Sequence, residues 1–114
     1  MHIEHQMVAD AAMVALRPRK DCRVKRIYAY EVMSETDWNI PNQQNAFIPN
    51  VFEDVSYIIE KKFEAMRAYA SQCHDFPEAR SIKALQALAT HRGTLVGMRA
   101  AEAFMLIREL KEGD

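Results

Sequence analysis

The segment from Val24 to Met33 constrains the fold of this chain more than any other. It is short, rich in β-branched and aromatic side chains, and almost continuously apolar after Arg26. A strand that is apolar on both faces is typical of a parallel sheet covered by helices on each side. The segment therefore predicts an α/β fold in which this strand is buried on both faces.

A helix is expected before this strand, from Glu4 to Leu16. The segment is rich in alanine, which favours helix, and Pro18 ends it. Its apolar residues recur at helical spacing and predict one buried stripe. These residues are Met7, Val8, Ala11, Ala12, Val14 and Ala15.

Two more helices are expected after the strand. Asp54 is a suitable N-cap for the first, whose apolar face runs from Val55 to Cys73, and Ser81 can cap the second, which ends before Gly93. The tail from Thr94 to Leu110 fits either a helix or a short buried strand, and periodicity does not choose between them.

Composition places the chain among globular domains. It has 114 residues, 49% of them hydrophobic and 27% charged, which predicts a single domain over residues 1–114 with a real core. A net charge of -1 gives no electrostatic support for a nucleic acid partner. No apolar run or leader suggests a membrane or export, and Cys22 and Cys73 are expected to be free thiols. We therefore expect a cytoplasmic protein.

Two histidines near the start have a spacing that can serve a metal. His2 and His5 lie three residues apart, so a helix would place both on one side of a turn. The alternative is that both are solvated, because two nitrogens fall short of the three protein ligands of a catalytic zinc. Glu4 can orient a neighbouring imidazole or can simply be an exposed acid in a first helical turn.

The polar segment from Ser34 to Asn50 is a second place for function, because long loops are uncommon in compact domains unless they are functional or mobile. Trp38 within it can stack on a sugar or close over a pocket, or it can anchor its own loop. No Gly-rich phosphate loop and no GxSxG motif is present, so nucleotide binding and nucleophilic catalysis have no support.

Read in order, several segments resemble the carboxy-terminal half of the LmbE/PIG-L family of zinc-dependent N-acetylglucosaminyl de-N-acetylases. His2-Ile3-Glu4-His5 is similar to the family's second metal motif, which begins a helix that ends in Arg-Pro, as Arg17-Pro18 does here. Tyr28-Ala29-Tyr30-Glu31-Val32 and Thr36-Asp37-Trp38-Asn39 are similar to its strand and substrate loop. The remaining matches are Phe47-Ile48-Pro49-Asn50-Val51-Phe52, Glu60-Lys61-Lys62, Tyr69, Ser71-Gln72, Arg80-Ser81, Arg92-Gly93 and Ala101-Glu102-Ala103-Phe104.

The resemblance implies the carboxy-terminal part of a Rossmann-like α/β fold, with about three helices packed on one or two short strands and a strand after Phe104. It makes His5 a zinc ligand and His2 a candidate for stabilising the oxyanion, with Glu4 orienting its neighbour. It places Glu31, Trp38 and Asn39 with the substrate, an amino sugar carrying an acetamide. In the family, zinc-bound water attacks the acetamide, and an Asp of an earlier Ala-His-Pro-Asp-Asp-Glu motif is the general base.

This sequence departs from the family in two ways. Glu4 stands where an Asp is usual, and the Ala-His-Pro-Asp-Asp-Glu motif, with two zinc ligands and the base, is absent. We therefore expect a partial deacetylase that is inactive alone and binds zinc only with an amino-terminal half. The alternative is a non-catalytic remnant or interaction module, expected to be a homo-oligomer because its apolar strand needs cover. A third possibility is a metal-independent helical adaptor outside the family.

Overall fold

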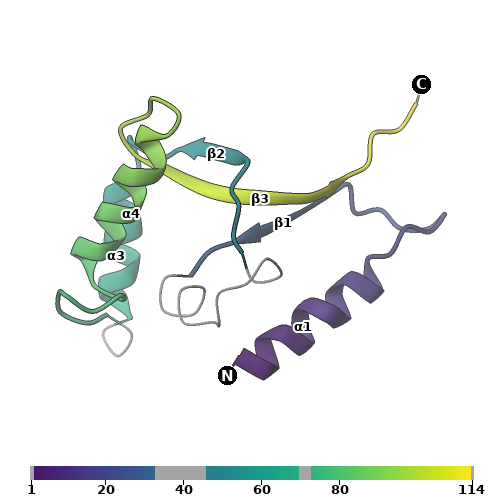
Figure 1. The fold of residues 1–114 in the computed structure, drawn as a ribbon, viewed down its shortest axis with the longest axis horizontal. Helices are drawn as coiled ribbons and strands as arrows, with labels where there is room; N and C mark the ends of the chain where they lie inside the picture. The colour runs from purple at the N-terminus through teal and green to yellow at the C-terminus, as the bar shows by residue number, and fades with distance from the viewer. Residues whose placement is uncertain (1, 33–45, 70–72, 114) are drawn as a thin grey trace.

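The computed structural model describes residues 2–32, 46–69 and 73–113, with side chains in the first helix described from residue 7 onward. This part of the chain is a mixed α+β structure (Figure 1). The elements in order are α1 (His2–Ala15), β1 (Arg26–Tyr30), β2 (Val51–Asp54), α3 (Ile59–Ala68), α4 (Ile82–Thr94) and β3 (Ala101–Glu109). No helix in the described ranges is long and apolar enough to cross a membrane.

The three strands form one antiparallel sheet in the order β1-β3-β2. Phe104 of β3 pairs with Tyr30 on one side and with Val51 on the other, so the last strand in the sequence occupies the centre of the sheet. The tail, for which periodicity left helix and strand open, is thus a strand, as the resemblance implied. It begins at Ala101, before Phe104.

The prediction of a parallel strand buried on both faces is wrong. β1 is an antiparallel edge strand in which exposed and half-buried residues alternate. Tyr28 is 45% exposed and Tyr30 is 70% exposed. The physical reason is that an antiparallel strand needs to bury only one of its faces, while the other can be exposed to solvent. Tyrosine tolerates such exposure because its ring carries a polar hydroxyl.

β2 was not expected, and the role predicted for Asp54 is wrong. Asp54 ends β2, and its Oδ1 accepts hydrogen bonds from the backbone N of Ser56 at 2.9 Å and from its Oγ at 2.7 Å. The carboxylate therefore closes a turn after the strand. The helix that Asp54 was expected to cap begins later, at Ile59, without a side-chain cap.

The cap predicted for the last helix is confirmed. Ser81 is only 2% exposed, and its Oγ accepts a hydrogen bond from the backbone N of Ala84 at 3.1 Å. The helix continues past Gly93 to Thr94. A Cβ at Gly93 would lie 2.5 Å from the carbonyl oxygen of Met98, so glycine allows the chain to fold back closely, and Gly97, at φ +76°, makes the turn toward β3.

The buried core is small and lies where α3 and α4 pack against one end of the sheet (Figure 1). It contains Val55, Ala89 and Ala100, with Ile59 packed against them, and Phe63 is 3% exposed. The amphipathic face predicted between Val55 and Cys73 is thus buried in part, since Tyr69 is 68% exposed.

α1 confirms the first predicted helix, but the buried stripe expected on it is wrong. Met7, Val8 and Val14 are each more than 60% exposed. α1 lies on the opposite side of the molecule from α3 and α4, and its end is held by the Arg108 side chain, which donates a hydrogen bond to the carbonyl oxygen of Leu16 (Figure 1). The stripe lacks cover because the core forms at the other end of the sheet.

Candidate pocket between the sheet and α4

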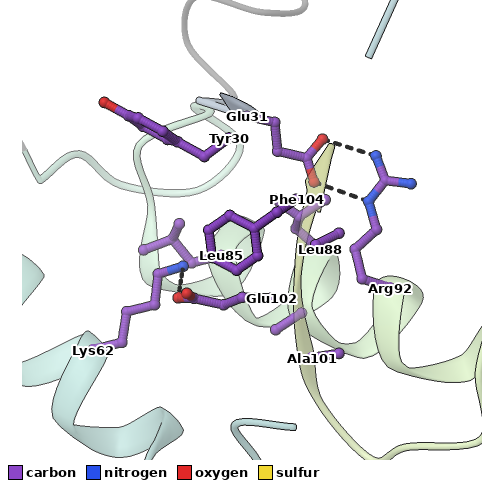
Figure 2. A pocket seen from close by; sticks show the side chains of 11 residues that line it. Tyr30, Glu31, Lys62, Leu85, Leu88, Arg92, Ala101, Glu102 and Phe104 are labelled. Carbon is purple, nitrogen blue, oxygen red and sulfur yellow. Dashed lines mark hydrogen bonds and ion pairs between the residues drawn. The ribbon is translucent and has the colours of Figure 1, made fainter. Parts of the chain in front are cut away.

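A pocket of about 160 Å³ opens where the end of β1 approaches α4 and β3 (Figure 2). Its apolar lining includes Leu85 and Leu88 from α4 and Phe104 from β3. The ring of Phe104 also meets Tyr28 edge to face, with ring centroids 6.1 Å apart. Two ion pairs complete the lining, and both join segments that are far apart in the sequence.

The first ion pair fixes the chain just after β1 to α4. Arg92 donates from Nε to Glu31 Oε1 at 2.9 Å and from Nη2 to Oε2 at 2.8 Å, as Figure 2 shows. The side chains of Arg92 and Glu31 are only 17% and 12% exposed. The guanidinium also lies 5.7 Å from the ring centroid of Phe47. A two-bond ion pair in this sheltered position has a defined geometry as well as a favourable charge interaction.

The second ion pair joins α3 to β3. Lys62 Nζ lies 2.7 Å from Glu102 Oε1, and both side chains are partly exposed. Glu102 is paired in the sheet with Glu53 of β2, and two carboxylates directly opposite each other repel. Lys62 therefore supplies the positive charge that this position of the sheet requires.

The pocket has limited chemical capacity by itself. Glu31 and Glu102 each have a basic partner, so the lining is balanced in charge. Pockets that enclose a small molecule usually measure roughly 300 to 1,000 Å³, and this one is smaller. It is large enough to accept one group of a ligand, or to form part of a larger site.

Of the residues that the sequence singled out, only Glu31 has a described side chain in this pocket. Trp38 and Asn39 lie outside the described residues. His2, Glu4 and His5 belong to the first turns of α1, where the described structure does not extend to side chains. In the ranges that are described, no group of three or more His, Cys, Asp or Glu side chains is arranged to hold a metal.

Sequence reasoning did not single out Arg92 and Lys62 as site residues. Arg92 lies 61 residues from Glu31, and Lys62 lies 40 residues from Glu102. No local spacing in the sequence could therefore identify these pairs. The one available signal was indirect, because Arg92-Gly93 and Glu60-Lys61-Lys62 are among the segments that carry the family resemblance.

The resolved pKa shifts occur at surface ion pairs and one turn outside this pocket. The side-chain hydrogen bond from Arg26 lowers the pKa of Glu109, and the one from Lys25 lowers the pKa of Glu112. The hydrogen bonds from Ser56 lower the pKa of Asp54. All three carboxylates are ionised at neutral pH and help to hold the sheet and the turn after β2.

Comparison of the chain with models of protein families, with curated proteins and with solved structures finds no match to any of the three. The functional argument therefore depends on the residues and their arrangement.

Proposed function

We propose that this chain is the carboxy-terminal part of a de-N-acetylase of the LmbE/PIG-L type, inactive alone and completed by an amino-terminal half. The pocket is the observation that carries the proposal. Four segments that separately resemble the family contribute its polar and aromatic lining. They are Tyr28 to Val32, Glu60 to Lys62, Arg92-Gly93 and Ala101 to Phe104.

The contacts between these segments explain why each segment carries the residue types that it does. Glu31 needs Arg92, and Glu102 needs Lys62, because a sheltered or opposed carboxylate is costly without a cation. Gly93 is required directly after Arg92 because no side chain fits against Met98. Segments that serve one structural unit in this way are what a shared fold would require, which supports the resemblance.

Under this proposal, the fold is the carboxy-terminal portion of a Rossmann-like domain, and the substrate is an acetamide on an amino sugar. His5 is the zinc ligand that this chain contributes, and His2 lies one turn away on α1. The sequence lacks the Ala-His-Pro-Asp-Asp-Glu motif, so under this proposal the two remaining ligands and the general base come from the other half. The zinc would then supply an activated water for hydrolysis of the amide.

A complementation experiment tests this function. The chain is purified alone and together with an amino-terminal half that carries Ala-His-Pro-Asp-Asp-Glu, and zinc content and acetate release from an N-acetylglucosamine conjugate are measured. We expect zinc and activity in the pair only, and we expect His5→Ala to remove both. His91→Ala, which changes an exposed histidine on α4, is the matched control and should keep both. A complemented pair with neither zinc nor activity would contradict the proposal.

The exposed side of α1 favours a second candidate role, a self-associating module without catalysis. Large apolar side chains on this helix lie open to water, which is a feature of interaction surfaces. The same purified chain separates the two roles, because a module needs no zinc and no second half.

A further inference from the structure

The chain has more accessible surface than a compact protein of its size. Its surface is 9063 Å² for a mass of 13.1 kDa, whereas a compact monomer of that mass is expected to expose about 6,400 Å². Its radius of gyration is 16.2 Å, against about 13 Å for a compact chain of this length. The excess of about 2,700 Å² is larger than the roughly 800 Å² that each partner buries in a standard interface.

α1 contributes a continuous apolar part of this surface. With about 100° of rotation per residue, Met7, Val8, Val14 and Ala15 all lie within about 60° of Ala11 around the helix. All five are exposed. Ala12 and Leu16, which are half-buried, lie on the side that turns toward the rest of the chain. We name the five residues Met7, Val8, Ala11, Val14 and Ala15 the α1 stripe.

We propose that the α1 stripe packs against the α1 stripe of a second copy of this chain, in an antiparallel pair centred on Ala11. The sizes of the side chains suit this arrangement. A two-fold axis at Ala11 places Met7 opposite Ala15 of the second copy, and Val8 opposite Val14 of the second copy. The small Ala11 at the centre allows two helices to approach closely, the long Met7 opposes the small Ala15, and two valines of equal size oppose each other.

Charge supports the antiparallel orientation. α1 contains the acids Glu4 and Asp10, has no basic residue in its last turn, and is followed directly by Arg17, Arg19 and Lys20. An antiparallel pair brings the acidic beginning of each helix toward the basic segment after the other, and it also opposes the two helix dipoles favourably. A parallel pair would place like charges side by side.

This dimer is compatible with the proposed function but does not depend on it. The helical period places positions 2 and 5 about 120° to 180° around α1 from Ala11. A dimer through the α1 stripe therefore does not use the side of α1 that carries positions 2 and 5.

Light scattering and sedimentation of the purified chain at micromolar concentration test the proposal. We expect a particle of twice the 13.1 kDa chain mass. Ala11→Glu should weaken the dimer at least tenfold, because it places two carboxylates at the two-fold axis, while glutamate keeps the helix. Ala9→Glu, an equal change at an exposed position about 160° around the helix, should leave the dimer intact. Circular dichroism verifies that both variants keep their helices.

A cross-linking experiment gives an independent readout. In a chain with Cys22→Ser and Cys73→Ser, Ala11→Cys should oxidise to a covalent dimer and Ala9→Cys should not, because only position 11 meets its own copy. A monomeric wild-type chain, or equal behaviour of the two positions in both experiments, would overturn the proposal. If Ala11→Glu instead disrupts only the complex with the amino-terminal half, that half is the occupant of the α1 stripe and the dimer is wrong.

Discussion

Arg92 and Glu31 lie 61 residues apart and form two hydrogen bonds in a position where each side chain is less than one-fifth exposed. The pair links the end of β1 to α4, so it connects the amino-terminal edge of the sheet to the helical layer. The buried core cluster does not include β1, since it consists of Val55, Ala89 and Ala100 with Ile59 packed against them.

Breaking this pair is expected to destabilise the chain. Arg92→Gln leaves the Glu31 carboxylate sheltered without its cation, which should cost about 1 to 3 kcal/mol in the free energy of unfolding. Urea titration followed by circular dichroism measures the change. Arg26→Gln, which breaks an exposed pair with Glu109, is the control and should cost clearly less, because water screens an exposed pair. Equal losses of unfolding free energy for the two variants would show that the sheltered Arg92–Glu31 pair contributes no more to stability than an exposed ion pair.

Gly93 should not accept any side chain. Gly93→Ala places a Cβ within 2.5 Å of the Met98 carbonyl oxygen, and the backbone must shift to relieve the clash. We expect a loss of about 1 to 3 kcal/mol in unfolding free energy. Gly113→Ala, at a position with nothing within 4 Å, is the matched control and should be close to neutral. A Gly93→Ala variant as stable as the wild type would contradict the close approach.

The cap at Ser81 should be measurable in the same assay. Ser81→Ala removes the acceptor for the backbone N–H of Ala84 and should cost about 1 kcal/mol. Thr90→Ala changes an exposed residue within the same helix and should be slightly stabilising, because alanine has the higher helix propensity. A Ser81→Ala variant as stable as the wild type would contradict the cap.

The turn after β2 should make the free energy of unfolding depend on pH in the acid range. Hydrogen bonds from Ser56 hold the pKa of Asp54 below its ordinary value of 3.8, so the folded state favours the carboxylate. Its contribution is present above pH 3.8 and is lost as the pH falls through the lower folded pKa. Titration followed by carboxyl carbon NMR should show the pKa of Asp54 rising toward 3.8 in Ser56→Ala. The pKa of Glu109, lowered by Arg26, should not move in this variant.

Local signals in the sequence identified the elements whose causes are local. The alanine-rich first helix, Ser81 as a cap and the strand character of Arg26 to Tyr30 all follow from neighbouring residues, and the structure contains each of them. β2 could not be recognised because it has only four residues, and two of these are acids that resemble the start of a helix.

Features that depend on distant partners were beyond this kind of inference. The apolar run after Arg26 suggested a parallel strand, but its direction and exposure are set by β3, which lies more than 70 residues later. Glu31 was singled out for a substrate role, yet its partner Arg92 could not be known from spacing. The apolar residues of the first helix were expected to form one buried stripe, because periodicity shows which side of a helix is apolar but does not show what covers that side.

The position of β3 determines when the sheet can form during synthesis. β1 and β2 do not pair with each other, and both bind to a strand that is made after them. While the ribosome adds residues 55 to 100, both edge strands have no partner in the sheet and their backbone groups are open to other chains. The sheet therefore forms late and almost all at once, and the period before β3 emerges is when this protein most needs protection from aggregation.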